Sequence, residues 1–111
     1  MEIGANCSVD RGTIDDTVVE DDVKVDSFSV IAHNSLTRRG TIIVGAAIGG
    51  SCTLGEKTYI APRAVIKNQI SIGSNCFVGM KCVVREPLSD DMAIPAQGIK
   101  ALHVKNYRHF L

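Results

Sequence analysis

The sequence predicts an all-β fold in which short parallel strands coil into a narrow three-sided prism. Aliphatic residues recur every six positions, a spacing that fits neither an α-helix nor the simple alternation of a flat sheet. A small residue follows most of them by four positions, where the walls of a narrow coil converge. The 111 residues include no Trp, two Tyr and three Phe, and an interior this narrow has no space for rings.

The aliphatic positions mark the predicted strands. Nine of them, from Leu36 to Val84, follow one another at intervals of six without exception. Five more precede them, with an interval of ten between Val9 and Val19 and an interval of five between Ile31 and the first of the nine. We interpret the long interval as an inserted loop at residues 15–17 and the short one as a deletion.

All four cysteines occupy the small positions of this repeat, namely Cys7, Cys52, Cys76 and Cys82. A thiol is a compact apolar side chain that suits such a position. The spacing of the four includes no C-x-x-C pair, which argues against zinc and redox sites. We therefore expect buried reduced thiols and no metal site.

The repeat resembles the hexapeptide repeat of the left-handed parallel β-helix family, in which three hexapeptides make one coil. This resemblance implies a left-handed parallel β-helix of about four to five coils over residues 1–93, with three stacked faces. The aliphatic residues then fall on these faces as Val19, Leu36, Leu54 and Ile72; as Ile3, Val25, Ile42, Ile60 and Val78; and as Val9, Ile31, Ile48, Ile66 and Val84.

Residues 94–111 follow the repeat, and we expect them to form an extended turn and a short C-terminal helix. From Ile99 onward the apolar residues share a helical stripe. A helix of about 12 residues is marginal alone, and a domain this small buries only about 60–68% of its unfolded surface. Both points favour association between chains, and the resemblance implies a homotrimer.

Composition argues against several other classes of protein. Basic and acidic residues balance at 12 each, so no overall charge draws the chain to nucleic acid. The first residues show no basic segment followed by an apolar one, which a secretory signal needs. The longest apolar stretch, residues 42–48, is much shorter than the ~20 residues that span a bilayer. We expect a cytoplasmic protein without a transmembrane segment.

The most informative tetrapeptide is Ile31-Ala32-His33-Asn34. His33 is the only histidine of the repeat region, and its position predicts a side chain that faces out of the coil. One coil onward the equivalent residue is Gly50. A histidine beside an open backbone amide combines a general base with an oxyanion donor, which is the minimum for acyl transfer. The alternative interpretation is a solvated surface histidine.

Three segments carry a closer resemblance. They are Ile3-Gly4-Ala5-Asn6, the stretch over residues 9–18 and the tetrapeptide that contains His33. In order and spacing they resemble the UDP-3-O-acylglucosamine N-acyltransferases of lipid A synthesis. The resemblance covers residues 3–60 well and the later repeats only generically. It implies that His33 deprotonates a sugar amine, which attacks an acyl thioester, and that the Gly50 N–H is the oxyanion donor.

Five further residues are candidates for contacting the sugar or orienting the base: Asp10, Asp26, Asn34, Asn68 and Gln69. Each aspartate either orients the histidine in a cleft between subunits or simply suits its corner of the coil. The family tends to carry a second histidine where this register places the Asn-Gln pair. It also carries a large N-terminal domain that helps to hold the uridine, which we do not expect within these 111 residues. These departures, with the deletion before residues 37–41, leave the acceptor sugar open.

The net charge of zero is a cancellation of two unlike regions. Residues 1–26 hold eight acidic and two basic residues, whereas residues 27–111 hold ten basic and four acidic ones. The predicted register stacks Arg39 over Lys57 and Arg63 over Lys81. Such cations suit the phosphopantetheine arm of acyl carrier protein or the phosphates of coenzyme A. The alternative is an ordinary solubilising surface.

Three functions stay open at this point. The first is a homotrimeric N-acyltransferase that moves an acyl group from acyl carrier protein or coenzyme A to an amino sugar, with no covalently bound cofactor. The second is an acetyl-coenzyme-A-dependent sugar acetyltransferase on the same fold. The third is a catalytically silent assembly module or truncated duplicate.

Overall fold

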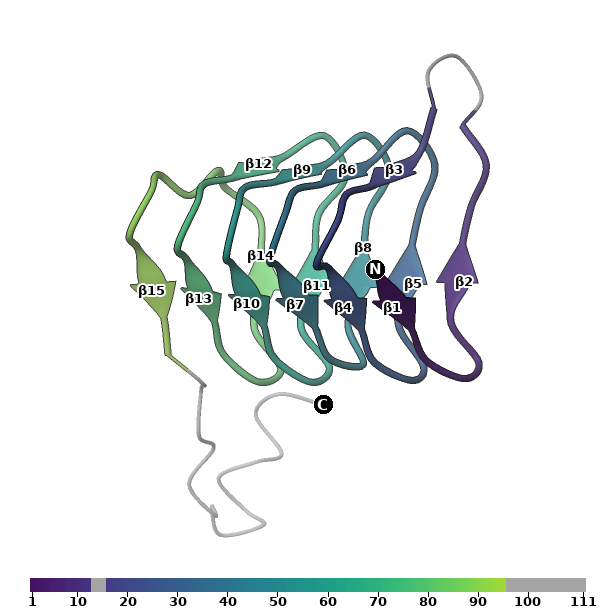
Figure 1. Cartoon of the computed structure of the whole chain (residues 1–111). Helices are drawn as coiled ribbons and strands as arrows, with labels where there is room; N and C mark the ends of the chain where they lie inside the picture. Colours follow the sequence, from purple (N-terminus) through teal and green to yellow (C-terminus); the bar gives the residue numbers. More distant parts are fainter. Residues whose placement is uncertain (13–15, 96–111) are drawn as a thin grey trace, which may run out of the picture.

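The computed structural model describes residues 1–12 and 16–95, which form a left-handed parallel β-solenoid (Figure 1). In Figure 1 the chain descends through one row of strands in front, rises through a second row behind and returns across the top through a third. The coils advance from right to left, which makes the solenoid left-handed. This confirms the fold class predicted from the six-residue spacing. The expected C-terminal helix lies outside the described residues.

Three parallel sheets form the faces of the prism. Sheet A contains β1 (Glu2–Ile3), β4 (Lys24–Val25), β7 (Ile42–Ile43), β10 (Tyr59–Ile60), β13 (Phe77–Val78) and β15 (Ala93–Ile94). Sheet B contains β2 (Ser8–Val9), β5 (Val30–Ile31), β8 (Ala47–Ile48), β11 (Val65–Ile66) and β14 (Val83–Val84). Sheet C contains β3 (Val18–Val19), β6 (Leu36–Thr37), β9 (Thr53–Leu54) and β12 (Ser71–Ile72). Residues 1–12 and 16–95 include no helix that is long and apolar enough to cross a membrane.

The corners between strands explain why such short strands persist. At most corners the third residue has a positive φ, as at Asn34 (59°), Gln69 (63°) and Asn75 (54°). Asn is among the non-glycine residues that adopt this left-handed conformation most readily. At most of these corners the backbone N–H of this third residue donates to a carbonyl of the preceding coil, so the hydrogen-bond ladder continues around the corner.

The core is one column of aliphatic side chains with small residues at the corners. Residues such as Ile31, Leu54 and Ile60 are fully buried. Corner hydroxyls satisfy buried backbone groups: Ser35 Oγ donates to the Gly49 carbonyl at 2.9 Å and accepts from the Cys52 N–H at 3.3 Å. The four thiols are free, three of them buried and Cys7 partly buried. The column therefore replaces the aromatic core that a globular domain of this size would have.

The predicted register is wrong between Ile31 and Ile48. Thr37 and Ile43 point into the core and are fully buried, whereas the predicted Leu36 and Ile42 are only half-buried. The five-residue interval lies between Ile43 and Ile48, not directly after the tetrapeptide that contains His33. The prediction failed because Leu36-Thr37 and Ile42-Ile43 each offer two registers. Leu36 is more apolar than Thr37, and the six-residue spacing from Leu36 to Ile48 then selected Ile42 over Ile43.

The coil also continues beyond Val84, where the six-residue repeat of the sequence stops. Leu88 forms a parallel bridge to Ile72 in sheet C. β15 then pairs with β13 in sheet A, with Ile94 level with Val78. A further partial coil therefore forms from residues whose spacing no longer shows the repeat.

Candidate functional site

The corner between sheets B and C carries most of the predicted site, and we call it the His33 corner. It comprises residues 10–12, 16–17, 32–35, 49–52 and 67–70. The Ser51 N–H donates to the His33 carbonyl at 2.8 Å, and the Gln69 N–H donates to the Gly50 carbonyl at 2.8 Å. These bonds place His33, Gly50 and Asn68 at equivalent positions of three successive coils. The pairing of His33 with Gly50 is the one predicted from the sequence, because the deletion lies between them in either register.

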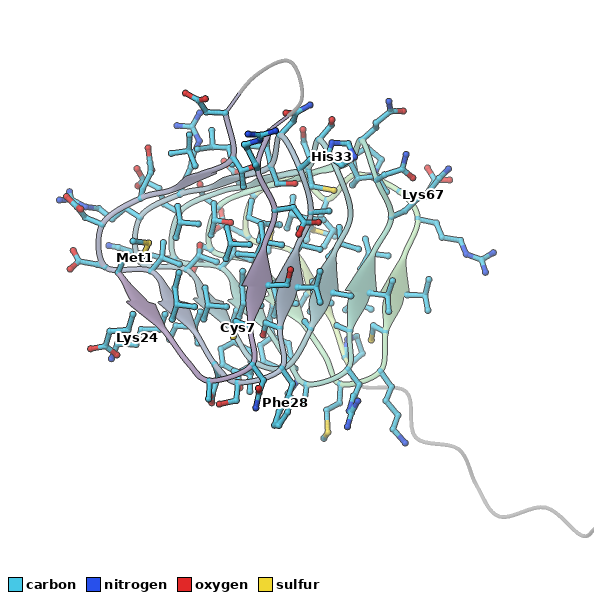
Figure 2. All side chains as sticks on the ribbon, turned by 90° about the vertical axis from the view of Figure 1, so that its right-hand side faces the viewer. Met1, Cys7, Lys24, Phe28, His33 and Lys67 are labelled. Carbon is cyan, nitrogen blue, oxygen red and sulfur yellow. The ribbon has the colours of Figure 1, made fainter. Side chains whose placement is uncertain are left out.

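His33 lies directly over Gly50. A Cβ atom built on Gly50 would lie 2.8 Å from both Cε1 and Nε2 of the imidazole, so the ring occupies the space that a side chain would need. His33 is exposed and lies at the upper edge of the molecule in Figure 2, whereas Gly50 is buried. Only glycine allows this packing, since any Cβ would push the imidazole away.

Both groups that acyl transfer would use are free of protein partners in the part of the chain described. Within it, the His33 imidazole makes no hydrogen bond or ion pair, and the Gly50 N–H has no acceptor. An imidazole next to an unused amide can accept a proton while the amide stabilises an oxyanion. The chemistry available at this corner is therefore proton transfer with electrostatic stabilisation.

Cys52 lies at the same corner but does not act as a nucleophile. Burial raises the pKa of its thiol, while backbone hydrogen bonds at Ile70 and Gln69 oppose the rise. Its Sγ donates to the Lys67 carbonyl at 3.0 Å. A buried protonated thiol is inert, because the thiolate is the reactive form. This agrees with the prediction that Cys52 fills space.

The two candidate aspartates lie at different corners. Asp10 belongs to the His33 corner, one coil before Ala32, and its Oδ1 accepts from Ser8 Oγ at 2.9 Å. Asp26 lies at the corner between sheets A and B, where its Oδ1 accepts from the N–H of Ser27 at 2.7 Å. Neither makes a hydrogen bond or ion pair with the His33 imidazole in the described part of this chain. A role for Asp26 at His33 would require a neighbouring subunit.

The three candidate amides all lie at the His33 corner. Asn34 follows His33 directly, and Asn68 and Gln69 lie two coils onward. The backbone of Asn68 packs closely on Gly49, where a Cβ would lie 2.6 Å from the Asn68 nitrogen. Asn68 and Gln69 are exposed. The structure thus brings these residues to one edge of the molecule with the proposed base.

The cationic candidates lie at the other two corners. Arg63 and Lys81 stack as predicted at the corner between sheets A and B, where the Lys81 N–H donates to the Pro62 carbonyl at 3.1 Å. The predicted stack of Arg39 over Lys57 is wrong, because the N–H of Lys57 bonds to the Arg39 carbonyl and its Cγ packs over Gly40. The cause is the one-residue error in the register of β6.

Arg39 is surrounded by acidic groups instead. The side-chain Nε of Arg39 lies 3.9 Å from Asp22 Oδ2, and its backbone N–H donates to Glu20 Oε1 at 3.0 Å. It shares a surface groove with Glu20, Asp21 and Glu56. An exposed ion pair of this kind contributes little to stability, but it makes Arg39 a weaker candidate for an anionic donor than Arg63 or Lys81.

Sequence reasoning missed one residue at the His33 corner. The hydroxyl of Thr17 accepts a hydrogen bond from the Asn34 N–H at 2.8 Å. Thr17 comes from the insertion that the ten-residue interval indicates. The signal was present as that interval, but the contact crosses between coils and no spacing along the chain specifies it.

The repeat region matches a known family of sequences. Residues 51–86 match the family described as bacterial transferase hexapeptide (six repeats). The later coils of the chain therefore carry the hexapeptide repeat of this transferase family. The match covers these regular coils, whereas His33 lies in an earlier part of the chain.

Curated relatives cover the earlier part as well. The chain is 37% identical over 87 residues to the probable UDP-3-O-acylglucosamine N-acyltransferase 2, mitochondrial, of Arabidopsis thaliana, over 77% of this chain and 29% of the relative. It is 34% identical over 89 residues to the UDP-3-O-acylglucosamine N-acyltransferase of Albidiferax ferrireducens, over 79% of this chain and 27% of the relative. The chain therefore spans less than a third of the length of these relatives.

A solved structure shares the fold. It is a mutant form of perosamine N-acetyltransferase from Caulobacter crescentus in complex with CoA and GDP-perosamine. The TM-score is 0.52 at 16% identity, over 85% of this chain and 53% of that one. At this identity the likeness shows that the two chains share the solenoid architecture.

Proposed function

We propose that the chain contributes to N-acyl transfer from a thioester to the amine of a sugar, with His33 as general base. The observation that carries the proposal is the packing of the His33 imidazole on Gly50, whose N–H has no acceptor in the described residues. The names of the curated relatives support the reaction class, since both are N-acyltransferases of an acylated glucosamine.

The reaction needs both groups in sequence. The amine nitrogen attacks the thioester carbonyl carbon, and His33 takes a proton from that nitrogen. The carbonyl π electrons move to oxygen, and the Gly50 N–H donates to the resulting oxyanion. When the carbonyl re-forms, the C–S bond breaks, and the leaving thiolate takes the proton from the imidazolium. An imidazole suits both transfers, because it can accept a proton and return it near neutral pH.

We propose that this site lies between subunits of a homotrimer. The outward positions of sheet B form an apolar row in which Val30, Val65 and Val83 are 40%, 42% and 58% exposed. On sheet A, Phe77 stacks on Tyr59 with ring centroids 5.4 Å apart. Apolar rows on two adjacent faces favour coverage by other chains.

Arg63 and Lys81 are then the candidates for binding the phosphates of acyl carrier protein or coenzyme A.

A thioester-release assay tests the proposal. It offers acyl carrier protein and coenzyme A donors with nucleotide-linked and free amino sugars. We expect thiol release with at least one pair, and we expect His33→Ala to reduce kcat by about 10²–10⁴-fold, the usual contribution of a general base. Ser71→Ala, on the outer face of sheet C, is the matched control and retains full activity.

The donor that supports thiol release shows whether acyl carrier protein or coenzyme A carries the acyl group. Equal rates for the wild type and His33→Ala with every active pair would contradict the assignment of the base. An absence of release with every pair would instead favour the silent assembly module. Sedimentation of the wild type tests the trimer, and a stable monomer would contradict it.

A further inference from the structure

The corners share a rule that the His33 corner breaks at one residue. At the third position of a corner, the N–H normally donates to a backbone carbonyl of the coil before it. Ser51 bonds to the His33 carbonyl at 2.8 Å, and Asn75 bonds to the Glu56 carbonyl at 2.8 Å. These bonds hold the left-handed residue of one coil on the corner of the previous coil.

Asn34 occupies the same position but has a different acceptor. The preceding coil is interrupted here, because ten residues rather than six separate Val9 from Val19. The Asn34 N–H donates to the side-chain hydroxyl of Thr17 at 2.8 Å. A threonine at the end of the insertion therefore replaces the backbone carbonyl that the insertion removes.

We propose that Thr17 is a positioning residue for His33, an inference that rests on the proposed function. Asn34 directly follows His33 and has a φ of 59°, so its N–H fixes the turn from which the imidazole projects. On the other side of the turn, the His33 carbonyl accepts from Ser51. Thr17 and Ser51 thus hold the turn from the coil before and the coil after, and together they seat the ring on Gly50.

Two substitutions of Thr17 distinguish the contribution of its hydroxyl from the contribution of its side-chain shape. Thr17→Val keeps the branched shape and removes the acceptor, whereas Thr17→Ser keeps the acceptor. Thr53→Val is the control, because Thr53 lies on the outer face of β9 and its hydroxyl makes no hydrogen bond in the described residues.

Nuclear magnetic resonance tests the positioning without reference to activity. In Thr17→Val we expect amide exchange of Asn34 to accelerate about tenfold, the usual effect of one lost hydrogen bond. The amide of Gln69, which bonds to the Gly50 carbonyl, is the internal reference and keeps its rate. We also expect the nuclear Overhauser effect between His33 Hε1 and Gly50 Hα to weaken. Thr17→Ser restores both signals. An unchanged Asn34 amide or an unchanged Overhauser effect overturns the proposal.

Kinetics then test whether the position matters to the reaction. With a substrate pair that the wild type uses, we expect kcat of Thr17→Val to fall about tenfold while KM for the donor and acceptor stays within about twofold. Thr17→Ser recovers kcat, and Thr53→Val matches the wild type. A loss of the Overhauser effect without a loss of kcat would make Thr17 purely structural. A wild type that releases no thiol overturns the proposed function, whereas the resonance signals still decide whether Thr17 seats the imidazole.

Discussion

The His33 corner and the corner between sheets C and A use the same backbone turn and close it differently. At the second of these, which we call the Arg39 corner, side chains cap the N–H of the second corner residue. Glu20 caps Arg39 at 3.0 Å, and Ser74 caps Glu56 at 3.0 Å. At the His33 corner the equivalent N–H of Gly50 has no acceptor in the described part of the chain.

The difference shows how a repetitive fold can carry a single site. The turn geometry and the ladder are common to both corners, so they contribute stability without specifying chemistry. At the Arg39 corner a polar side chain accepts a hydrogen bond from the N–H of the second corner residue, so that amide is not available to a ligand. At the His33 corner a glycine and an imidazole take those places, and the amide stays available. The candidate site is a corner whose hydrogen bonding is left incomplete.

The largest expected effect comes from Gly55→Ala at the Arg39 corner. A Cβ on Gly55 would lie 2.5 Å from the Ser74 nitrogen, and backbone of the next coil cannot move aside. We expect the free energy of unfolding to fall by about 3 kcal/mol, as overpacking of a rigid site does. Urea denaturation measures this loss. The control is Ser71→Ala, and an equal midpoint for the two variants would mean that the coils separate easily.

Gly50→Ala at the His33 corner is expected to spare the fold and remove the activity. Here the added Cβ meets the imidazole, a side chain that can rotate away at little cost to stability. We expect the thioester-release kcat to fall about 100-fold, since a base displaced by about 1 Å loses that much. The urea midpoint should stay close to that of the wild type. A large loss of stability with normal activity in the remaining folded protein would contradict the contrast between the two corners.

A smaller effect of opposite sign is expected at Thr37. Its hydroxyl is fully buried in sheet C and is the buried side-chain oxygen without a hydrogen-bond partner among the described residues. Thr37→Val removes this polar atom and keeps the branched shape that strands favour. We expect the free energy of unfolding to rise by about 1 kcal/mol. Thr41→Val is the comparison, because Thr41 Oγ1 donates to the Gly55 carbonyl at 2.7 Å, and that variant should lose stability.

The smallest effect concerns pH and the thiol beneath the site. Burial raises the pKa of the Cys52 thiol in the folded protein above its ordinary value. The thiol stays protonated in the folded protein at a pH where it ionises in the unfolded chain. Its contribution to stability is therefore present below about pH 9 and is lost as pH rises through the folded pKa. Cys52→Ala should flatten the fall in urea midpoint between pH 8 and 10 relative to the wild type, and a parallel fall in both would contradict the burial effect.

Much of the fold could be predicted because many residues specify the register of their strand through their immediate sequence neighbours. An isolated aliphatic residue at six-residue spacing, such as Leu54 or Ile72, has one apolar register, and these residues lie in the core as predicted. Leu36 and Ile42 each adjoin a second residue that can also face inward. There the register depends on how the coils stack and on where a corner can shorten, as at Gly45 with a φ of 54°. Neither the stacking of the coils nor the place where a corner shortens can be read from the sequence.

The site shows the same limit. His33 and Gly50 were paired correctly because their relation depends only on the number of coils between them. Arg39 was placed over Lys57 wrongly because that relation depends on the position of the deletion within the coil. Thr17 was missed because its hydrogen bond to Asn34 joins two coils across an insertion, and only the folded structure brings the two together.

The two changes of chain length described above both fall at corners. The insertion at residues 15–17 and the shortening at Gly45 leave the strands of the neighbouring coils paired in register. Equivalent positions of the solenoid thus recur once per coil, although the number of residues in a coil can vary. A histidine and its glycine partner keep their relation in space at 17 residues apart here. A search for similar sites in other repeat proteins should therefore count coils and allow the residue spacing to differ.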